Sequence, residues 1–195
     1  MTSATRPPAS LDALSALLLA EPMALRPLEQ WNPPDCGMMD LTIAADGRWI
    51  HAGAPITRPQ LVKLFASILW REEDRYFLKT PVEKIGIHVQ DLPFLAVEMQ
   101  SHSENGHNCL IFRTNTDDVI RAGPDHALLF SPAGDGAVRP ALHVRRNLYA
   151  RISRPLYYEL VNRGETNLLD GTPWFGVWSG GCFFPMIEAD ALELA

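Results

Sequence analysis

The strongest chemical signal in the sequence is the run of alternating residues from Ala141 to Ile152. Five polar side chains occupy its odd positions: His143, Arg145, Asn147, Tyr149 and Arg151. The even positions are apolar except for Arg146. This period of two predicts one long strand with its polar side chains on a single face, and with a bulge or a sheet edge at Arg146.

Arginine gives this run its chemistry. Five arginines and no acidic residue lie from Arg139 to Arg154, in a chain with a formal net charge of −6. Guanidinium groups bind phosphates and carboxylates through paired hydrogen bonds, and a helix start at the end of the run adds free N–H groups. We therefore predict an anion site. The alternative is a solvated strand whose arginines pair with distant acids such as Glu83 or Glu159.

The turn from Thr80 to Lys84 is a second candidate site. Its carboxylate, Glu83, lies between Lys79 and Lys84 and is placed to orient an arginine from the other half of the chain. The alternative is an ordinary turn with surface charges, which is the more common meaning of such a pattern.

The remaining sequence contains no recognisable catalytic or metal-binding motif. Ser179 and Gly180 have the wrong spacing for a nucleophile elbow. The residues His102, His107 and Cys109 lie in a polar stretch without the spacing of a metal site. Phosphate-binding loops, dinucleotide-binding glycine motifs and zinc-protease motifs do not occur. We predict no catalytic residues, no metal and no cofactor.

A repeated motif predicts how these residues are positioned. Ile56-Thr57-Arg58-Pro59 recurs as Ile152-Ser153-Arg154-Pro155, and both copies precede an apolar helical pattern. Thr57 and Ser153 are expected N-caps, and proline suits the first turn of a helix. Because a cation at a helix start is disfavoured, we expect each arginine to meet a carboxylate or an anion. The repeat indicates an internal duplication.

The order of the predicted elements is strands, one helix and strands, and then the same again. This order predicts an α+β fold with two repeated strand-helix-strand units and antiparallel sheets. We expect an N-terminal helix and proline-rich connector over residues 1–35, a first repeat over 36–105 and a second repeat over 106–195. The second predicted helix ends near Arg163, and the chain closes with a strand from Trp174 to Met186.

Composition excludes several classes of function. The chain has 195 residues, and 47% of them are hydrophobic, which is enough for a real core. The negative net charge argues against binding to a nucleic-acid polymer. No apolar stretch reaches the roughly 20 residues of a membrane span. Three scattered cysteines fit a reducing cytoplasm, where we expect the protein to reside.

Several motifs, taken in order, resemble a bacterial family named domain of unknown function 1285. They are Cys36-Gly37, Asp46-Gly47-x-Trp49, Ile56-Thr57-Arg58-Pro59, Leu64 to Leu69, Thr80 to Lys84, Asp91-x-Pro93-Phe94, Arg145-x-x-Leu148-x-Ala150-Arg151, Tyr157-Tyr158-x-Leu160-Val161 and Ser179-x-Gly181. The resemblance covers about Cys36 to Pro185. It implies two repeated structural motifs, the C-terminal one superficially like a pleckstrin-homology domain. It also implies a site between the halves for a nucleotide-like ligand, with a role in signal transduction, and no established activity.

We therefore expect a binding module for a small anionic ligand, rather than an enzyme. The expected ligand-binding residues come from both halves: Arg58, Glu83, Lys84, His143, Arg145, Tyr149, Arg151 and Tyr158. The cations would neutralise the ligand, and a tyrosine would stack on its ring. Two alternatives remain. One is an adaptor that binds a protein partner in signalling, and the other is a hydrolase of phosphorylated small molecules with His143 as its base.

Overall fold

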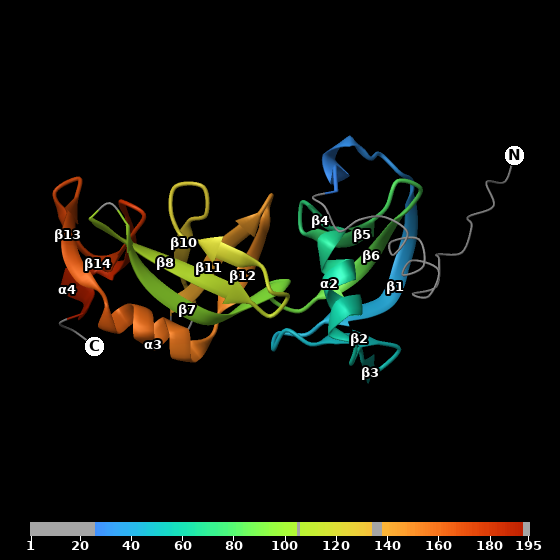
Figure 1. Cartoon of the computed structure of the whole chain (residues 1–195), viewed down its shortest axis with the longest axis horizontal. Coiled ribbons are helices and arrows are strands. Elements are labelled where there is room, and N and C mark those ends of the chain that lie inside the picture. Colours follow the sequence, from blue (N-terminus) through green and yellow to red (C-terminus); the bar gives the residue numbers. More distant parts are fainter. Residues whose placement is uncertain (1–25, 105, 134–137, 193–195) are drawn as a thin grey trace, which may run out of the picture. The chain divides into compact units, whose positions relative to one another are not determined.

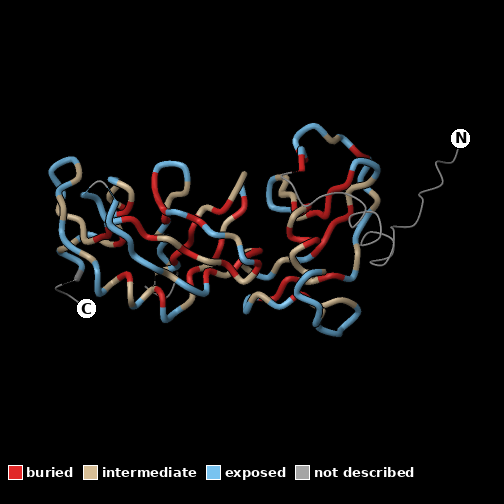
Figure 2. The backbone as a smooth tube through the Cα atoms, viewed as in Figure 1, coloured by how far each residue is buried: buried red, intermediate tan, exposed pale blue. Residues whose placement is uncertain are grey.

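The structure is a computed structural model that describes residues 26–104, 106–133 and 138–192. The helix predicted near the N-terminus lies outside these residues. The chain forms two compact units, residues 1–91 and 92–195 (Figure 1). The boundary between the units therefore lies earlier than the expected position after residue 105, because the strands on either side of that residue pair with each other. Figure 2 shows that each unit has its own buried segments.

The N-terminal unit is a six-stranded sheet with one α-helix. Its elements are η1 (Leu28–Gln30), β1 (Asp35–Ile43), β2 (Trp49–His51), β3 (Ala54–Pro55), α2 (Pro59–Ser67), β4 (Leu69–Glu72), β5 (Arg75–Lys79) and β6 (Lys84–Val89). The strand order in the sheet is β3-β2-β1-β6-β5-β4. All neighbours are antiparallel except β1 and β6.

Helix α2 covers the core of this unit through its apolar face. Phe65 is fully buried and stacks on Trp49 with ring centroids 6.3 Å apart. The helix ends at Ser67, although the apolar sequence continues through Ile68 and Leu69 to Trp70. Trp70 instead pairs with Phe77 across β4 and β5, because this pairing buries the apolar residues on the sheet.

The C-terminal unit contains a second six-stranded sheet, a three-stranded sheet and two helices. Its elements are β7 (Phe94–Glu104), β8 (His107–Thr114), β9 (Val119–Arg121), β10 (Leu128–Pro132), β11 (Val138–Arg145), β12 (Leu148–Ile152), α3 (Arg154–Asn162), β13 (Glu165–Leu169), β14 (Thr172–Ser179), β15 (Cys182–Glu188) and α4 (Ala189–Leu192). The strand orders are β10-β11-β12-β7-β8-β9 and β13-β14-β15. We predicted one closing strand from Trp174 to Met186. The chain instead forms the two strands β14 and β15 there, and they pair with β13 in a three-stranded antiparallel sheet.

The arginine-rich run is a hairpin and not the single long strand that we predicted. Arg146 adopts φ +53° in the two-residue connection between β11 and β12. Arg146 thus lies in a turn rather than at the expected bulge or sheet edge, and the register shift of the hairpin lies between His143 and Arg145. The alternation survives the turn, because His143 pairs with Tyr149 and both lie on the face opposite Leu142.

The two units confirm the predicted α+β fold with repeated units. The element order β10-β11-β12-α3-β13-β14-β15 repeats the order β1-β2-β3-α2-β4-β5-β6. The strand pairing differs between the copies. In the first copy β1 pairs with β6 in parallel, whereas in the second β12 pairs in parallel with β7, a strand outside the repeat. Each large sheet therefore contains one parallel pair of strands, whereas we predicted sheets that are antiparallel throughout.

Candidate ligand pocket

Arg145 was predicted to face a ligand, but its guanidinium is engaged inside the C-terminal unit. Its Nη1 lies 2.5 Å from the Asp118 carboxylate, and the guanidinium lies over the Phe94 ring at 4.7 Å. Thr116 donates a second hydrogen bond to Asp118, at 2.7 Å. Burial lowers the pKa of Arg145 from its ordinary value, and the Asp118 charge opposes this shift. This arrangement is typical of a structural ion pair.

His143, Tyr149 and Arg151 lie on one face of the β11–β12 hairpin. The two rings are 5.2 Å apart, and Arg151 donates to the carbonyl of Pro140. Both ring nitrogens of His143 lie next to backbone carbonyls, of Asp125 at 2.9 Å and of Arg146 at 2.5 Å. A backbone carbonyl oxygen thus occupies the hydrogen-bonding position of each nitrogen, so a substrate hydroxyl has no access to either one, which argues against His143 as a catalytic base.

The arginines of the repeated motif meet no carboxylate among the described residues. Arg58 is the exposed N-cap of α2, and its side chain has no hydrogen bond or ion pair with any described residue. Arg154 instead donates to the hydroxyl of Tyr158, at 3.0 Å, and lies over the same ring. Ser153 is the N-cap of α3 as predicted, whereas Thr57 precedes the cap of α2, and neither helix has a side-chain capping bond.

The second candidate site is also held by contacts within its own unit. Lys84 Nζ lies 2.6 Å from the Glu72 carboxylate and 4.7 Å from the centre of the Phe77 ring. This hydrogen bond lowers the pKa of Glu72. Glu83 shapes the turn through its backbone, which exchanges hydrogen bonds with Thr80. The expected site between the two repeats stays a prediction.

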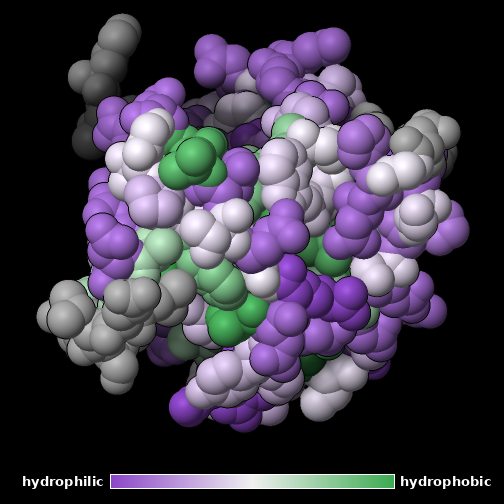
Figure 3. Space-filling model, turned by 90° about the vertical axis from the view of Figure 1, so that its left-hand side faces the viewer, coloured by the Kyte–Doolittle hydropathy of each residue, from purple (hydrophilic) through white to green (hydrophobic). Residues whose placement is uncertain are grey.

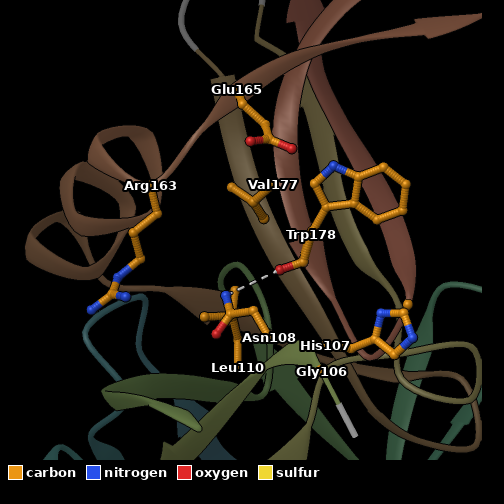
Figure 4. Close-up of a pocket in the computed structure, with 9 residues that line it drawn as sticks. Gly106, His107, Asn108, Leu110, Arg163, Glu165, Val177 and Trp178 are labelled. Atoms are coloured by element: carbon orange, nitrogen blue, oxygen red, sulfur yellow. Dashed lines mark hydrogen bonds between the residues drawn. The ribbon is translucent and has the colours of Figure 1, made fainter. Parts of the chain in front are cut away.

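A pocket of about 470 Å³ lies within the C-terminal unit (Figure 4). It is lined by residues from four segments: Gly106, His107, Asn108, Leu110, Arg163, Glu165, Val177, Trp178 and Gly181. The β7–β8 hairpin and β8 form one side, and the end of α3, β13 and the β14–β15 hairpin form the other. Its volume is in the range of small-molecule sites.

Ser179 fixes the two sheets that border this pocket. Its side chain is fully buried, accepts a hydrogen bond from Leu110 N at 2.8 Å and donates one to Ala122 O at 2.7 Å. Asn108 adds a backbone bond from Gly180 and a weak side-chain bond to Trp178 O. The Ser-Gly-Gly-Cys turn therefore joins β14 to β8 and β9, and it has a structural role rather than a nucleophilic one.

The polar groups in the pocket differ in how well they are paired. Arg163 donates to Ser101 Oγ at 3.1 Å and forms an ion pair with Glu159 at 3.0 Å. The side chains of His107 and Glu165 have no hydrogen bond or ion pair with any residue that the structure describes. Trp178 is 37% exposed and packs against Phe183 with ring centroids 5.3 Å apart. The unpaired imidazole, carboxylate and indole are the groups that a ligand can contact.

Sequence reasoning missed this pocket because its lining residues come from segments more than 50 positions apart. His107 and Cys109 were considered only as a loose metal cluster. Among the described residues no group of three His, Cys, Asp or Glu side chains is arranged to hold a metal ion. The one available signal was Trp178, an aromatic residue two positions before the Gly-Gly turn. No helix in the described ranges is long and apolar enough to cross a membrane.

Comparison with known proteins identifies the relatives of the chain. Two family models match it, "Domain of unknown function (DUF1285), N-terminal domain" over residues 26–92 and "Protein of unknown function (DUF1285), C-terminal domain" over residues 93–186. The junction of these matches agrees with the boundary between the compact units. No curated protein matches the chain.

Two crystal structures are similar to this protein, and both are of bacterial relatives. A DUF1285 family protein from Silicibacter pomeroyi DSS-3 is 42% identical, with a TM-score of 0.82 over 92% of this chain and 97% of that chain. A DUF1285 family protein from Shewanella baltica OS155 is 30% identical, with a TM-score of 0.51 over 64% of this chain and 91% of that chain. The family models cover both units, and the chain therefore belongs to the DUF1285 family, whose function is unknown.

Proposed function

We propose that the protein is a small-ligand-binding module and that its ligand occupies the pocket of the C-terminal unit. The observation that carries this proposal is the convergence of three unpaired side chains, those of His107, Glu165 and Trp178, on one pocket of about 470 Å³. Pockets of this size with a few convergent polar groups are the usual form of small-molecule sites.

A nucleotide-like anion is the ligand class predicted from the arginine run, and a role in signalling is what the family resemblance implied. The pocket offers groups for such a ligand. Trp178 can stack on a base, since its ring is partly exposed. His107 and Arg163 are the lining side chains able to contact a phosphate, although Arg163 already pairs with Glu159.

The alternatives have less support. A hydrolase would need a base, and both ring nitrogens of His143 lie next to carbonyl oxygens. An adaptor would present a broad apolar face. On the face of the C-terminal unit in Figure 3, hydrophobic residues form small patches among hydrophilic ones. Leu168 and Trp178 are exposed on the three-stranded sheet, but they are only two residues.

A thermal-shift screen of the full chain with nucleotides and small amines tests the proposal. A ligand at 100 times its Kd stabilises the folded state by about 2.7 kcal/mol, which raises the melting temperature by several degrees. We expect at least one hit, and we expect Trp178→Ala to abolish its effect. Val119→Ala is the control, because Val119 is also an exposed hydrophobic residue, on β9, but lies outside the pocket. Equal shifts in the parent and Trp178→Ala proteins would show that the ligand binds elsewhere.

A further inference from the structure

The charges of the pocket favour a different ligand class from the anion predicted from the arginines. Arg163 is neutralised by Glu159, whereas Glu165 has no partner among the described residues. The only other ionisable group of the lining is the imidazole of His107. Of the carboxylates in and beside the pocket, that of Glu165 is therefore the uncompensated one, and such a charge attracts cations.

Glu165 and Trp178 lie on the same face of the three-stranded sheet. Glu165 pairs with Gly176 in the register of β13 and β14, and Trp178 follows two positions later on β14. The Cβ atoms of such diagonal neighbours on an antiparallel pair of strands are about 7–8 Å apart. Figure 4 shows the Glu165 carboxylate directed toward the indole. A group of the size of an ammonium ion can contact both side chains.

Several aromatic rings of this protein have a cation of the protein over them, and Trp178 does not. Lys79 lies over Trp70 at 4.0 Å, Lys84 over Phe77 at 4.7 Å and Arg145 over Phe94 at 4.7 Å. No described cation lies over Trp178, which is 37% exposed. Tryptophan is the strongest cation–π partner among the aromatic side chains, and quaternary ammonium ligands use this contact.

We propose that the ligand carries an organic ammonium group, bound between the carboxylate of Glu165 and the indole of Trp178. This inference rests on the proposed function, because it names the ligand class of the same pocket. The carboxylate supplies the charge and the indole supplies a polarisable face; among the described residues Glu165 has no ion pair and Trp178 has no cation over its ring.

Choline and 3,3-dimethylbutan-1-ol test the inference as a matched pair, since they differ in charge but hardly in shape. The full chain is titrated with each, and the Trp178 indole N–H signal is followed by NMR, assigned as the signal missing in Trp178→Phe. We expect a saturable shift with choline and at least about tenfold weaker binding of the neutral alcohol, as expected for a loss of charge attraction. Equal affinity for the two compounds would overturn the inference.

Glu165→Gln isolates the contribution of the carboxylate. We expect this variant to bind choline about three- to tenfold more weakly. Glu188→Gln, which removes an exposed acid of β15 outside the pocket, should bind choline as the parent does. Unchanged binding in Glu165→Gln, confirmed as folded by its melting curve, would remove the assigned role.

The same titration separates this inference from the proposed function. If AMP shifts the Trp178 signal and choline does not, the ligand-binding proposal stands and the ammonium inference is wrong. If no compound of the screen shifts this signal, both are wrong. If choline shifts it and AMP does not, both are supported.

Discussion

Arg145 shows how a residue with the chemistry of a ligand site can serve the fold instead. Its charge is neutralised by Asp118, which lies in the turn before β9 and 27 positions earlier in the chain. Sequence alone predicted the burial alternation of this run correctly, because Leu142, Val144 and Leu148 are all buried. It could not predict the counter-ion, because no local pattern brings that turn next to β11.

Removal of this counter-ion should destabilise the C-terminal unit. The side chains of Arg145 and Asp118 are only 19% and 27% exposed. In Asp118→Asn, the largely buried guanidinium of Arg145 loses its Asp118 carboxylate, and we expect a loss of about 2–3 kcal/mol in the free energy of unfolding. Urea unfolding measures this loss.

The control for this variant is Asp117→Asn at the neighbouring position. Asp117 pairs with Arg113 in an exposed ion pair, which contributes no more than about 1 kcal/mol. Asparagine also tolerates the positive φ of this residue. Equal losses in the two variants would contradict the structural role of the Asp118–Arg145 pair.

Glu72 gives a prediction for pH dependence. The hydrogen bond from Lys84 lowers its pKa below the ordinary value of 4.5 in the folded protein. The Glu72–Lys84 contact is therefore fully stabilising above the pKa of the unfolded chain, and the stabilisation is lost as pH falls through the folded pKa. Urea unfolding from pH 6 to pH 3 should show a steeper loss of stability in the parent than in Glu72→Gln. Parallel profiles would count against the contact.

At the scale of elements, local signals located most strands and both central helices. Asp46-Gly47, a pair typical of hairpin turns, lies between β1 and β2, where Gly47 adopts a positive φ. The β11–β12 turn was missed because Arg146, an ordinary L-residue, adopts the positive φ that glycine or asparagine usually signals. The parallel pairs β1–β6 and β7–β12 were missed because they join strands that are distant in the chain.

Ser153 and Ser179 each lie at the boundary of an element, but they have different roles. Ser179 bridges Leu110 and Ala122 inside the protein, whereas Ser153 caps α3 without a side-chain bond. We expect Ser179→Ala to lower the free energy of unfolding by about 1–2 kcal/mol, because two buried backbone groups lose a partner. Ser153→Ala should cost less than about 0.5 kcal/mol. Chemical denaturation of both variants checks the order, and a reversed order would contradict it.

At the scale of the whole molecule, the repeat seen in the sequence exists, but its copies are joined into sheets differently. The first copy closes into one sheet through β1 and β6. In the second copy β10 contacts β15 without a hydrogen-bonded ladder, and three additional strands complete the larger sheet. The pocket borders the separate three-stranded sheet that results. Neither the unit boundary after Asp91 nor this pocket follows from the repeat alone.

The most direct test of the ligand-binding account is an amide and indole NMR shift map of the full chain with the strongest hit of the screen. The account predicts saturable shifts at Trp178, Glu165 and residues 106–108, all of which line or border the pocket. Saturable shifts confined to residues outside this set, or the same map in Trp178→Ala as in the parent protein, would contradict it.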